Sequence, residues 1–148
     1  MESIINYKKK YLNQVVDLFI DVFSQEPWND SWDSNKHAEE FLQDIVNTPG
    51  FKSLLYLKDD KVIGALFGHI IKWYEGDELY IREFFIDSNF QGKGIGTKLM
   101  NKLEKELKIE DIHTIVLLTE RDTEAKKFYD NKGFEVNNDI VFMIKNYE

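Results

Sequence analysis

The sequence has 148 residues, a formal net charge of −8 at pH 7, and no cysteine; 43% of its residues are hydrophobic. This length predicts one folded domain over residues 1–148, burying about two-thirds of the surface of its unfolded chain. The negative charge argues against nonspecific nucleic-acid binding, and the absence of cysteine excludes disulfides, thiolate zinc sites and cysteine nucleophiles. No apolar run approaches the ~20 residues that cross a bilayer. We therefore expect a cytoplasmic protein that binds neither membranes nor nucleic acids.

The N-terminal third predicts a short strand followed by two amphipathic helices. Apolar residues recur at helical spacing in two stripes, the first of which ends before Pro27. Ser34 is the expected N-cap of the second helix, which residues 47–50 terminate. The predicted elements are a strand at residues 4–5, a helix from Leu12 to Phe23, and a helix from Ala38 to Val46.

The remainder predicts an antiparallel meander and then alternating helices and strands. The meander disfavours a Rossmann-type order of alternating strands and helices. Residues 112–118 form an almost continuous apolar run, which is typical of a central strand covered on both faces. The predicted elements are strands at 51–57, 62–71 and 80–86, a helix at 95–107, a strand at 112–118, a helix around 125–129 with Gly133 as its C-cap, and strands at 134–136 and 140–144.

Residues 26–33, between the first two helices, form the least ordinary loop of the sequence. The loop contains Trp28 and Trp32 beside Glu26, Asp30 and Asp33. Tryptophans in a short loop can close the end of a hydrophobic core. An aromatic wall flanked by carboxylates can instead bind an amine, through cation–π contacts and ion pairs. Both interpretations stay open at this stage.

Three glycines, Gly92, Gly94 and Gly96, lie between a predicted strand and a predicted helix. Glycine lets the backbone approach a ligand closely, and the first N–H groups of the helix can then bind a phosphate. The spacing matches neither the P-loop nor the GxGxxG dinucleotide fingerprint. A tight strand-to-helix turn without a ligand is the alternative.

Two motifs resemble those of the GNAT superfamily of acetyl-CoA-dependent N-acetyltransferases. The first is QGKGIG at residues 91–96, preceded by REFFID, which is similar to that family's fourth strand. The second is the segment 122–134, which resembles NxxAxxFYxxxGF, with Asp122 where the family usually has Asn. Asp122 is an equally good helix N-cap, although its charge could weaken a contact to CoA. The resemblance implies an α/β (α+β) fold whose mixed central sheet of about seven strands is flanked by four helices.

The resemblance also implies that acetyl-CoA is the cosubstrate and that no metal is needed. Backbone N–H groups from Gln91 to Thr97 would hold the pyrophosphate, while the backbone at Phe84–Ile86 would pair with the pantetheine arm and polarise the thioester. The implied cofactor-binding residues are Phe84, Phe85, Ile86, Gln91, Gly92, Lys93, Gly94, Ile95, Gly96, Thr97 and Asp122.

Two proton-transfer roles need candidate residues, one for the departing thiolate and one for the attacking amine. Tyr129 occupies the family's tyrosine position and would protonate or stabilise the departing thiolate. Glu83 is the preferred general base, with Glu78 and Asp87 as alternatives. In the polyamine-acetylating branch, acids fill both slots at this point of the strand, whereas here the first is Arg82. A structural Arg82–Glu83 pair is the competing interpretation.

The acceptor is expected to be a small cationic amine. The sequence resembles proteins described as aminoglycoside 6′-N-acetyltransferases, and Glu26, Trp28, Asp30 and Trp32 would bind an aminoglycoside-like or polyamine-like molecule. The alternatives are acetylation of a protein or peptide amine, a non-catalytic acyl-CoA-binding module, and nucleotide binding at the glycines. A homodimer is possible through the apolar segment 140–144.

Overall fold

The computed structural model describes residues 1–148, which divide into two compact units, residues 1–118 and 119–148. The first unit contains all five strands and three of the four helices. Its elements are β1 (Glu2–Ile5), α1 (Leu12–Phe23), α2 (Asn35–Val46), β2 (Phe51–Lys58), β3 (Lys61–Ile71), β4 (Glu78–Ile86), α3 (Ile95–Ile109) and β5 (Thr114–Leu117), with short 3-10 turns at Lys9–Tyr11 and Ser88–Phe90.

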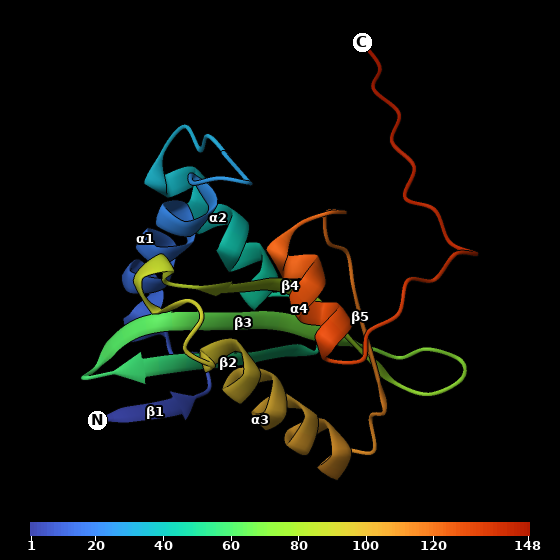
Figure 1. Cartoon of the computed structure of the whole chain (residues 1–148). Coiled ribbons are helices and arrows are strands. Elements are labelled where there is room, and N and C mark those ends of the chain that lie inside the picture. The colour runs from blue at the N-terminus through green and yellow to red at the C-terminus, as the bar shows by residue number, and fades with distance from the viewer. The chain divides into compact units, whose positions relative to one another are not determined.

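The five strands form one mixed sheet in the order β1-β2-β3-β4-β5. Strands β1 to β4 pair antiparallel and β5 joins β4 in parallel. Helices α1 and α2 lie against one face of this sheet and α3 lies against the other (Figure 1). The parallel β4–β5 pair needs a crossover connection, which α3 supplies.

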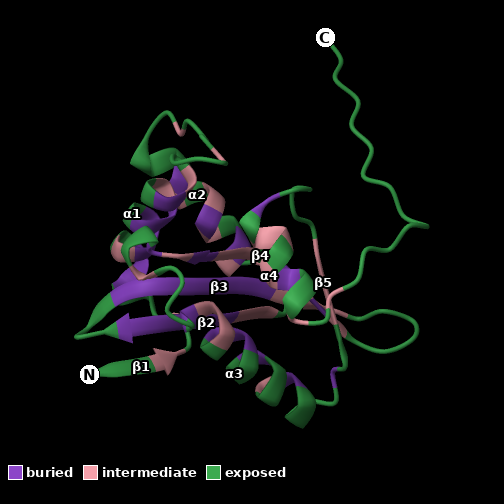
Figure 2. Cartoon of the chain, viewed as in Figure 1, coloured by how far each residue is buried: buried purple, intermediate pink, exposed green.

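The sheet face under α1 and α2 carries the main hydrophobic core. Each helix buries one apolar stripe, as its sequence predicts, and Ser34 Oγ caps α2 by accepting a hydrogen bond from the N–H of His37 at 3.0 Å. Four aromatic rings pack around Phe19, with centroids 5.1–5.7 Å from it: Phe23, Trp32, Phe41 and Phe85. Strands β2 and β3 are buried along most of their length (Figure 2).

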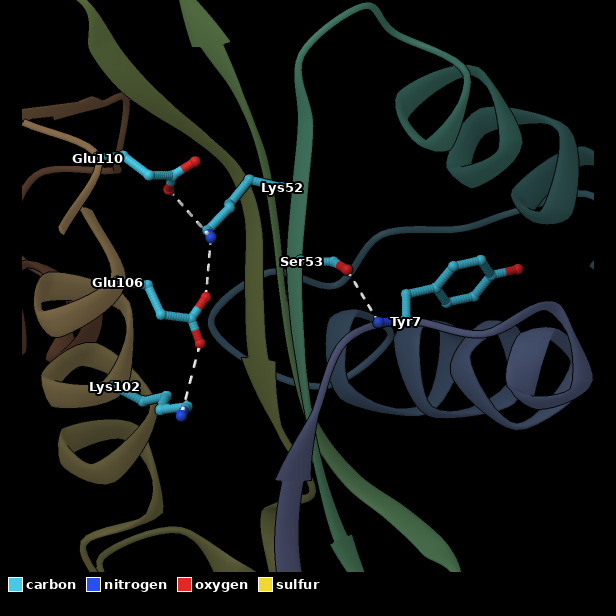
Figure 3. A network of polar contacts seen from close by, with 6 residues as sticks. All are labelled: Tyr7, Lys52, Ser53, Lys102, Glu106 and Glu110. Carbon is cyan, nitrogen blue, oxygen red and sulfur yellow. Dashed lines mark hydrogen bonds and ion pairs between the residues drawn. The ribbon is translucent and has the colours of Figure 1, made fainter. Parts of the chain in front are cut away.

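The opposite face packs tightly against α3. A Cβ at Gly64 would lie 2.9 Å from Ile86 Cδ1 and 3.3 Å from Leu99 Cδ1, so the helix and sheet approach closely there. At the edge of this contact, Lys52 Nζ bridges Glu106 at 2.8 Å and Glu110 at 3.3 Å (Figure 3). Figure 3 also shows the neighbouring residue Ser53, whose hydroxyl accepts the N–H of Tyr7 at 2.9 Å and fixes the chain between β1 and α1.

One β-bulge interrupts the pairing of β3 with β4. Phe67 lies opposite Glu83 and Gly68 lies opposite Ile81, so Arg82 is the extra residue. A Cβ at Gly68 would lie 2.5 Å from the carbonyl oxygen of Tyr80. Only glycine allows the two backbones to approach this closely.

The second unit contains α4 (Glu124–Asn131), which Gly133 ends with a φ of +89° as expected of a C-cap. The prediction that Asp122 caps this helix is wrong. Thr123 Oγ1 accepts the N–H of Lys126 at 3.1 Å, whereas Asp122 has a φ of +62°. The shorter side chain one position later therefore satisfies the first turn.

Two strand predictions are also wrong. Residues 134–136 and 140–144 form no strand, so the sheet has five strands instead of about seven. Ile140–Ile144 are five consecutive apolar residues without polar alternation, and the sequence alone does not supply the hydrogen-bonding neighbour that a strand requires. Because no later strand pairs with it, β5 lies at the edge of the sheet and is half-buried. The central strand covered on both faces that was expected here is therefore not formed.

Candidate functional site

The turn from β4 into α3 presents backbone N–H groups at a helix start. Gly94, with a φ of +83°, is the residue before the helix, and no side chain caps the N–H groups of the first turn. The first helical hydrogen bond runs from the N–H of Lys98 to the Gly94 carbonyl at 3.0 Å. The N–H groups of Ile95, Gly96 and Thr97 precede that bond, in the position where a helix binds an anion.

The space over this turn is open. A Cβ built at Gly92 or Gly94 meets nothing within 4 Å, in contrast to the crowded positions Gly64 and Gly68. Both Gly92 and Gly94 have positive φ, so their conformation is one that residues with a side chain rarely adopt. The arrangement fits a pyrophosphate group held by backbone N–H groups alone.

Two polar side chains hold the turn in shape. Gln91 Nε2 donates to the Ile86 carbonyl at 3.0 Å, and the buried carboxylate of Asp87 accepts the N–H of Asn89 at 2.9 Å. Lys93 lies over the ring of Phe90, 5.3 Å from its centre. Asp87 is therefore engaged in the turn, which weakens its candidacy as a general base.

Glu83 is the most perturbed carboxyl group of the chain. Its partner across the ladder is Phe67, a fully buried core residue, so the carboxyl group lies on the face that α1 and α2 cover. Burial raises the pKa of Glu83 to about 7, with a further upward contribution from Asp30 and an opposing one from Arg82. A carboxyl group with a pKa near neutral pH is suited to exchange protons during catalysis.

The loop between α1 and α2 is attached to the turn after β4 and packs towards β4 itself. Gln25 Nε2 donates to Ser88 Oγ at 3.2 Å and so joins the start of the loop to the 3-10 turn Ser88–Phe90. The ring of Trp28 contacts Phe23 at 5.5 Å, and Phe23 contacts Phe85 of β4 at 5.7 Å. The negative charge of Asp30, in this loop, raises the pKa of Glu83, so the loop acts electrostatically on that carboxyl group.

The structure separates the two loop tryptophans. Trp28 is half-buried and contacts Phe23, whereas Trp32 packs against Phe19 and Phe41 of the core at 5.4 and 5.3 Å. The Nε1 atom of Trp32 is buried without a hydrogen-bond partner. Glu26 and Asp30 are both exposed. Asp30 therefore contributes charge at Glu83 and Trp28 packs on Phe23, while Trp32 mainly closes the core.

The remaining predicted site residues lie along β4 and in the second unit. Phe84 and Ile86 are half-buried and Phe85 is buried. Within the second unit, Tyr129 is buried at 9% exposure and its ring contacts Phe134 at 5.4 Å. Asp122 is exposed.

Sequence reasoning missed the bulge and the residues that it brings together. It assigned no role to His69, whose ring lies 5.5 Å from that of Tyr80, or to the pairing of Gln25 with Ser88. A glycine inside an apolar strand is a known sign of a bulge, so Gly68 was the one signal available.

The chain holds no group of three or more His, Cys, Asp or Glu side chains that could bind a metal ion. None of its helices is long and apolar enough to span a bilayer.

This chain has a mixed sheet whose fourth strand is followed by a glycine-rich helix start without a side-chain cap. This arrangement is that of an acetyltransferase fold. The sequence model described as "Acetyltransferase (GNAT) family" matches residues 12–134. The probable spermine N(1)-acetyltransferase of Bacillus subtilis subsp. natto (strain BEST195) is 30% identical over 109 residues, covering 68% of this chain and 70% of the relative. The chain therefore belongs to the GNAT acetyltransferase family, and it is an N-acetyltransferase by class.

Solved structures share the fold over nearly the whole chain. An aminoglycoside acetyltransferase from an uncultured soil metagenomic sample, in complex with sisomicin, has a TM-score of 0.76 at 22% identity, covering 99% of this chain and 97% of the other. A predicted acetyltransferase from Clostridium acetobutylicum, solved with acetyl-CoA, has a TM-score of 0.74 at 19% identity, covering 97% and 96%. At these identities the likeness concerns the fold.

Proposed function

We propose that this protein is an acetyl-CoA-dependent N-acetyltransferase that transfers acetyl directly to a primary amine of a small acceptor with cationic groups. The observation that carries the proposal is the half-buried Glu83, with a pKa of about 7, next to the aromatic and acidic loop. The names of the relatives support an amine acceptor of the polyamine or aminoglycoside type.

The turn residues fit acetyl-CoA, which when bound supplies the acetyl thioester. Backbone N–H groups between Gln91 and Thr97 would hold the pyrophosphate, because the glycines leave open space in front of them. The backbone of Phe84–Ile86 would align the pantetheine arm and place an N–H against the thioester carbonyl. Asp122 is exposed, and a role in CoA binding remains part of the proposal.

Glu83 would take the proton from the attacking amine. Its burial keeps the carboxyl group close to half-ionised at neutral pH, and the ionised form accepts the proton. Trp28, Asp30 and Glu26 would hold the cationic remainder of the acceptor, with Trp32 supporting the wall from the core side. Holding amine and thioester together would itself contribute several kcal/mol to the rate.

Tyr129 would donate a proton or a hydrogen bond to the departing thiolate. This role follows from its position in the FY motif, where the family has its tyrosine, and from the phenol hydroxyl, which can donate a hydrogen bond. A Tyr129→Phe variant is expected to keep CoA binding and to lose turnover.

Three further predictions belong to the same proposal. We propose that residues 1–148 act as one GNAT domain. A homodimer is proposed through the segment Ile140–Ile144, whose side chains are 69–83% exposed and would gain from burial in an interface. The cytoplasmic location stays a prediction.

The test is thiol release from acetyl-CoA, measured with and without kanamycin, spermidine, lysine and a peptide with a free N-terminus. Release stimulated by kanamycin, spermidine or lysine supports the proposed class of small acceptors with cationic groups. Release with the peptide alone supports the alternative of a protein amine acetyltransferase. CoA binding without release by any amine supports a non-catalytic acyl-CoA-binding module.

A further inference from the structure

The bulge in β4 places Arg82 on the same side of the sheet as Glu83. Phe67 and His69 are two residues apart on β3 and therefore share a face, the one covered by α1 and α2. Glu83 pairs with Phe67 and Tyr80 pairs with His69, so both belong to that face. Arg82 joins them, because its guanidinium carbon lies 5.7 Å from the centre of the Tyr80 ring.

The guanidinium of Arg82 lies over the Tyr80 ring and forms no direct ion pair, although its charge acts on the neighbouring carboxyl group of Glu83. Arg82 is exposed and takes part in none of the ion pairs of the chain. The Tyr80 ring supports one side of it. An arginine has five N–H donors in a planar fork that matches a carboxylate, and here this fork is available beside Glu83.

His69 adds a second polar group at the same place. Its Nδ1 atom is buried and has no hydrogen-bond partner, while its ring lies 5.5 Å from the Tyr80 ring. Burial and, to a smaller extent, the charge of Arg82 lower the pKa of His69, which favours the neutral imidazole, a ring that carries one donor and one acceptor nitrogen.

We propose that Arg82, with Tyr80 and His69 beside it, forms an anion subsite of the acceptor site, and that the preferred acceptor carries a carboxylate close to its reacting amine. This inference rests on the proposed function, in which the amine is deprotonated at Glu83. The acidic loop with Asp30 then binds a second ammonium group. Among the cationic amines of the proposed function, the preferred acceptor is therefore a dibasic, amino-acid-like amine, and acceptors with positive charge alone are expected to be poorer substrates because they bring an ammonium group against Arg82.

The experiment compares three acceptors that share one carbon chain: lysine, its amide lysinamide, and cadaverine, which lacks the carboxyl group. For the wild type we expect kcat/KM to be at least about tenfold higher for lysine than for lysinamide or cadaverine, the size expected of a charge-assisted hydrogen bond. Arg82→Gln should abolish this preference. Lys72→Gln removes the same charge from an exposed position in the loop after β3 and should preserve it.

A second readout separates this inference from the proposed function. The NMR signal of the Arg82 Nε–H is followed in the wild type, without acetyl-CoA, while lysine or lysinamide is added. A shift with lysine and none with lysinamide supports the subsite, even if no amine is acetylated and the proposed function fails. Equal responses to lysine and lysinamide would overturn the proposed anion subsite. A preference for lysine that survives in Arg82→Gln would overturn it as well.

Discussion

The two halves of the candidate site are built from different parts of the chain. The turn from β4 into α3 offers backbone N–H groups, and its side chains, such as Gln91 and Asp87, only hold the turn in shape. The face under α1 and α2, together with the loop that joins these helices, offers side chains instead, among them Glu83 and Trp28.

This difference indicates a division of labour. A pyrophosphate is the same in every reaction of the family, and backbone groups suit it because they do not depend on side-chain identity. The acceptor, in contrast, can differ between enzymes. Substitution of side chains such as Arg82 and Asp30 can change which acceptor is bound without disturbing the fold. Substitutions in the two halves should therefore have separable effects on CoA binding and on acetyl transfer.

The largest expected effect is that of Glu83→Gln. Losing a general base typically lowers the rate by about 10²- to 10⁴-fold, and we expect a fall in kcat of that size with unchanged CoA affinity. Steady-state kinetics of thiol release would measure this fall in kcat. Glu78→Gln is the matched control, since Glu78 is another half-buried carboxyl group on β4. A loss in the control alone would make Glu78 the base.

Glu83 also predicts how activity and stability depend on pH. Activity should rise as the pH passes about 7, because only the ionised carboxylate accepts a proton. The pKa is raised from 4.5 to about 7 by burial, so the stability linked to it is fully present below pH 4.5 and is lost as the pH rises through 7. At pH 8 Glu83→Gln should therefore be more stable than the wild type by on the order of 2 kcal/mol, measured by urea unfolding.

The next largest effect is that of Gly94→Val. A β-branched residue is strained at a φ of +83°, and the turn must change shape to accept it. We expect CoA affinity to fall at least about tenfold by calorimetry. Gly76→Val introduces similar strain at a φ of +133° in the loop between β3 and β4, and should cost stability alone. Equal CoA affinity in wild type and Gly94→Val would refute the claim that the backbone of this turn binds CoA.

A smaller effect is expected from Trp28→Ala. The substitution removes the ring that contacts Phe23, and with it the aromatic wall proposed for the acceptor. The KM for the amine should rise several-fold, as expected for an exposed cation–π contact of about 0.5–1 kcal/mol, while CoA affinity stays the same. Trp73→Ala, at a tryptophan that is 49% exposed in the loop after β3, serves as the control. An unchanged KM would return Trp28 to a purely structural role.

The smallest effect is that of Lys52→Met, which leaves both halves of the site intact. Although burial alone would lower the pKa of Lys52, its bonds to Glu106 and Glu110 raise it overall. The stabilisation by these ion pairs is therefore fully present below about pH 10.5, the ordinary pKa of lysine, and is lost as the pH rises through the raised pKa of Lys52. Met keeps the aliphatic stem, so we expect a loss of about 1 kcal/mol in chemical unfolding at pH 7 and normal kinetics. A loss of activity here would mean that α3 packing influences the site.

Most of the fold could be predicted because the signals are local. The stripes of α1 and α2, the cap at Ser34 and the glycines before α3 each act within a few residues of sequence. The strands predicted after residue 133 failed because pairing is not local: an apolar run becomes a strand only beside a hydrogen-bonding neighbour.

The acceptor side of the site was harder to predict for a related reason. Strand alternation places Arg82 and Glu83 on opposite faces, but the bulge at Gly68 turns both to one face. The raised pKa of Glu83 likewise depends on burial under helices that are distant in sequence. The resemblance of the strand to the family's fourth strand therefore identified Glu83 as a candidate, but not the environment of its carboxyl group.

The central claim is tested most directly by measuring, on the same preparations of wild type and Glu83→Gln, the dissociation constant for CoA and the thiol release that amines stimulate. If the two halves of the site are independent, both proteins should bind CoA with equal affinity. The rate of amine-stimulated thiol release should be about 100-fold or more lower in the variant. Weakened CoA binding in Glu83→Gln, or release at the wild-type rate, would contradict the division of the site into a backbone-built cofactor half and a side-chain-built acceptor half.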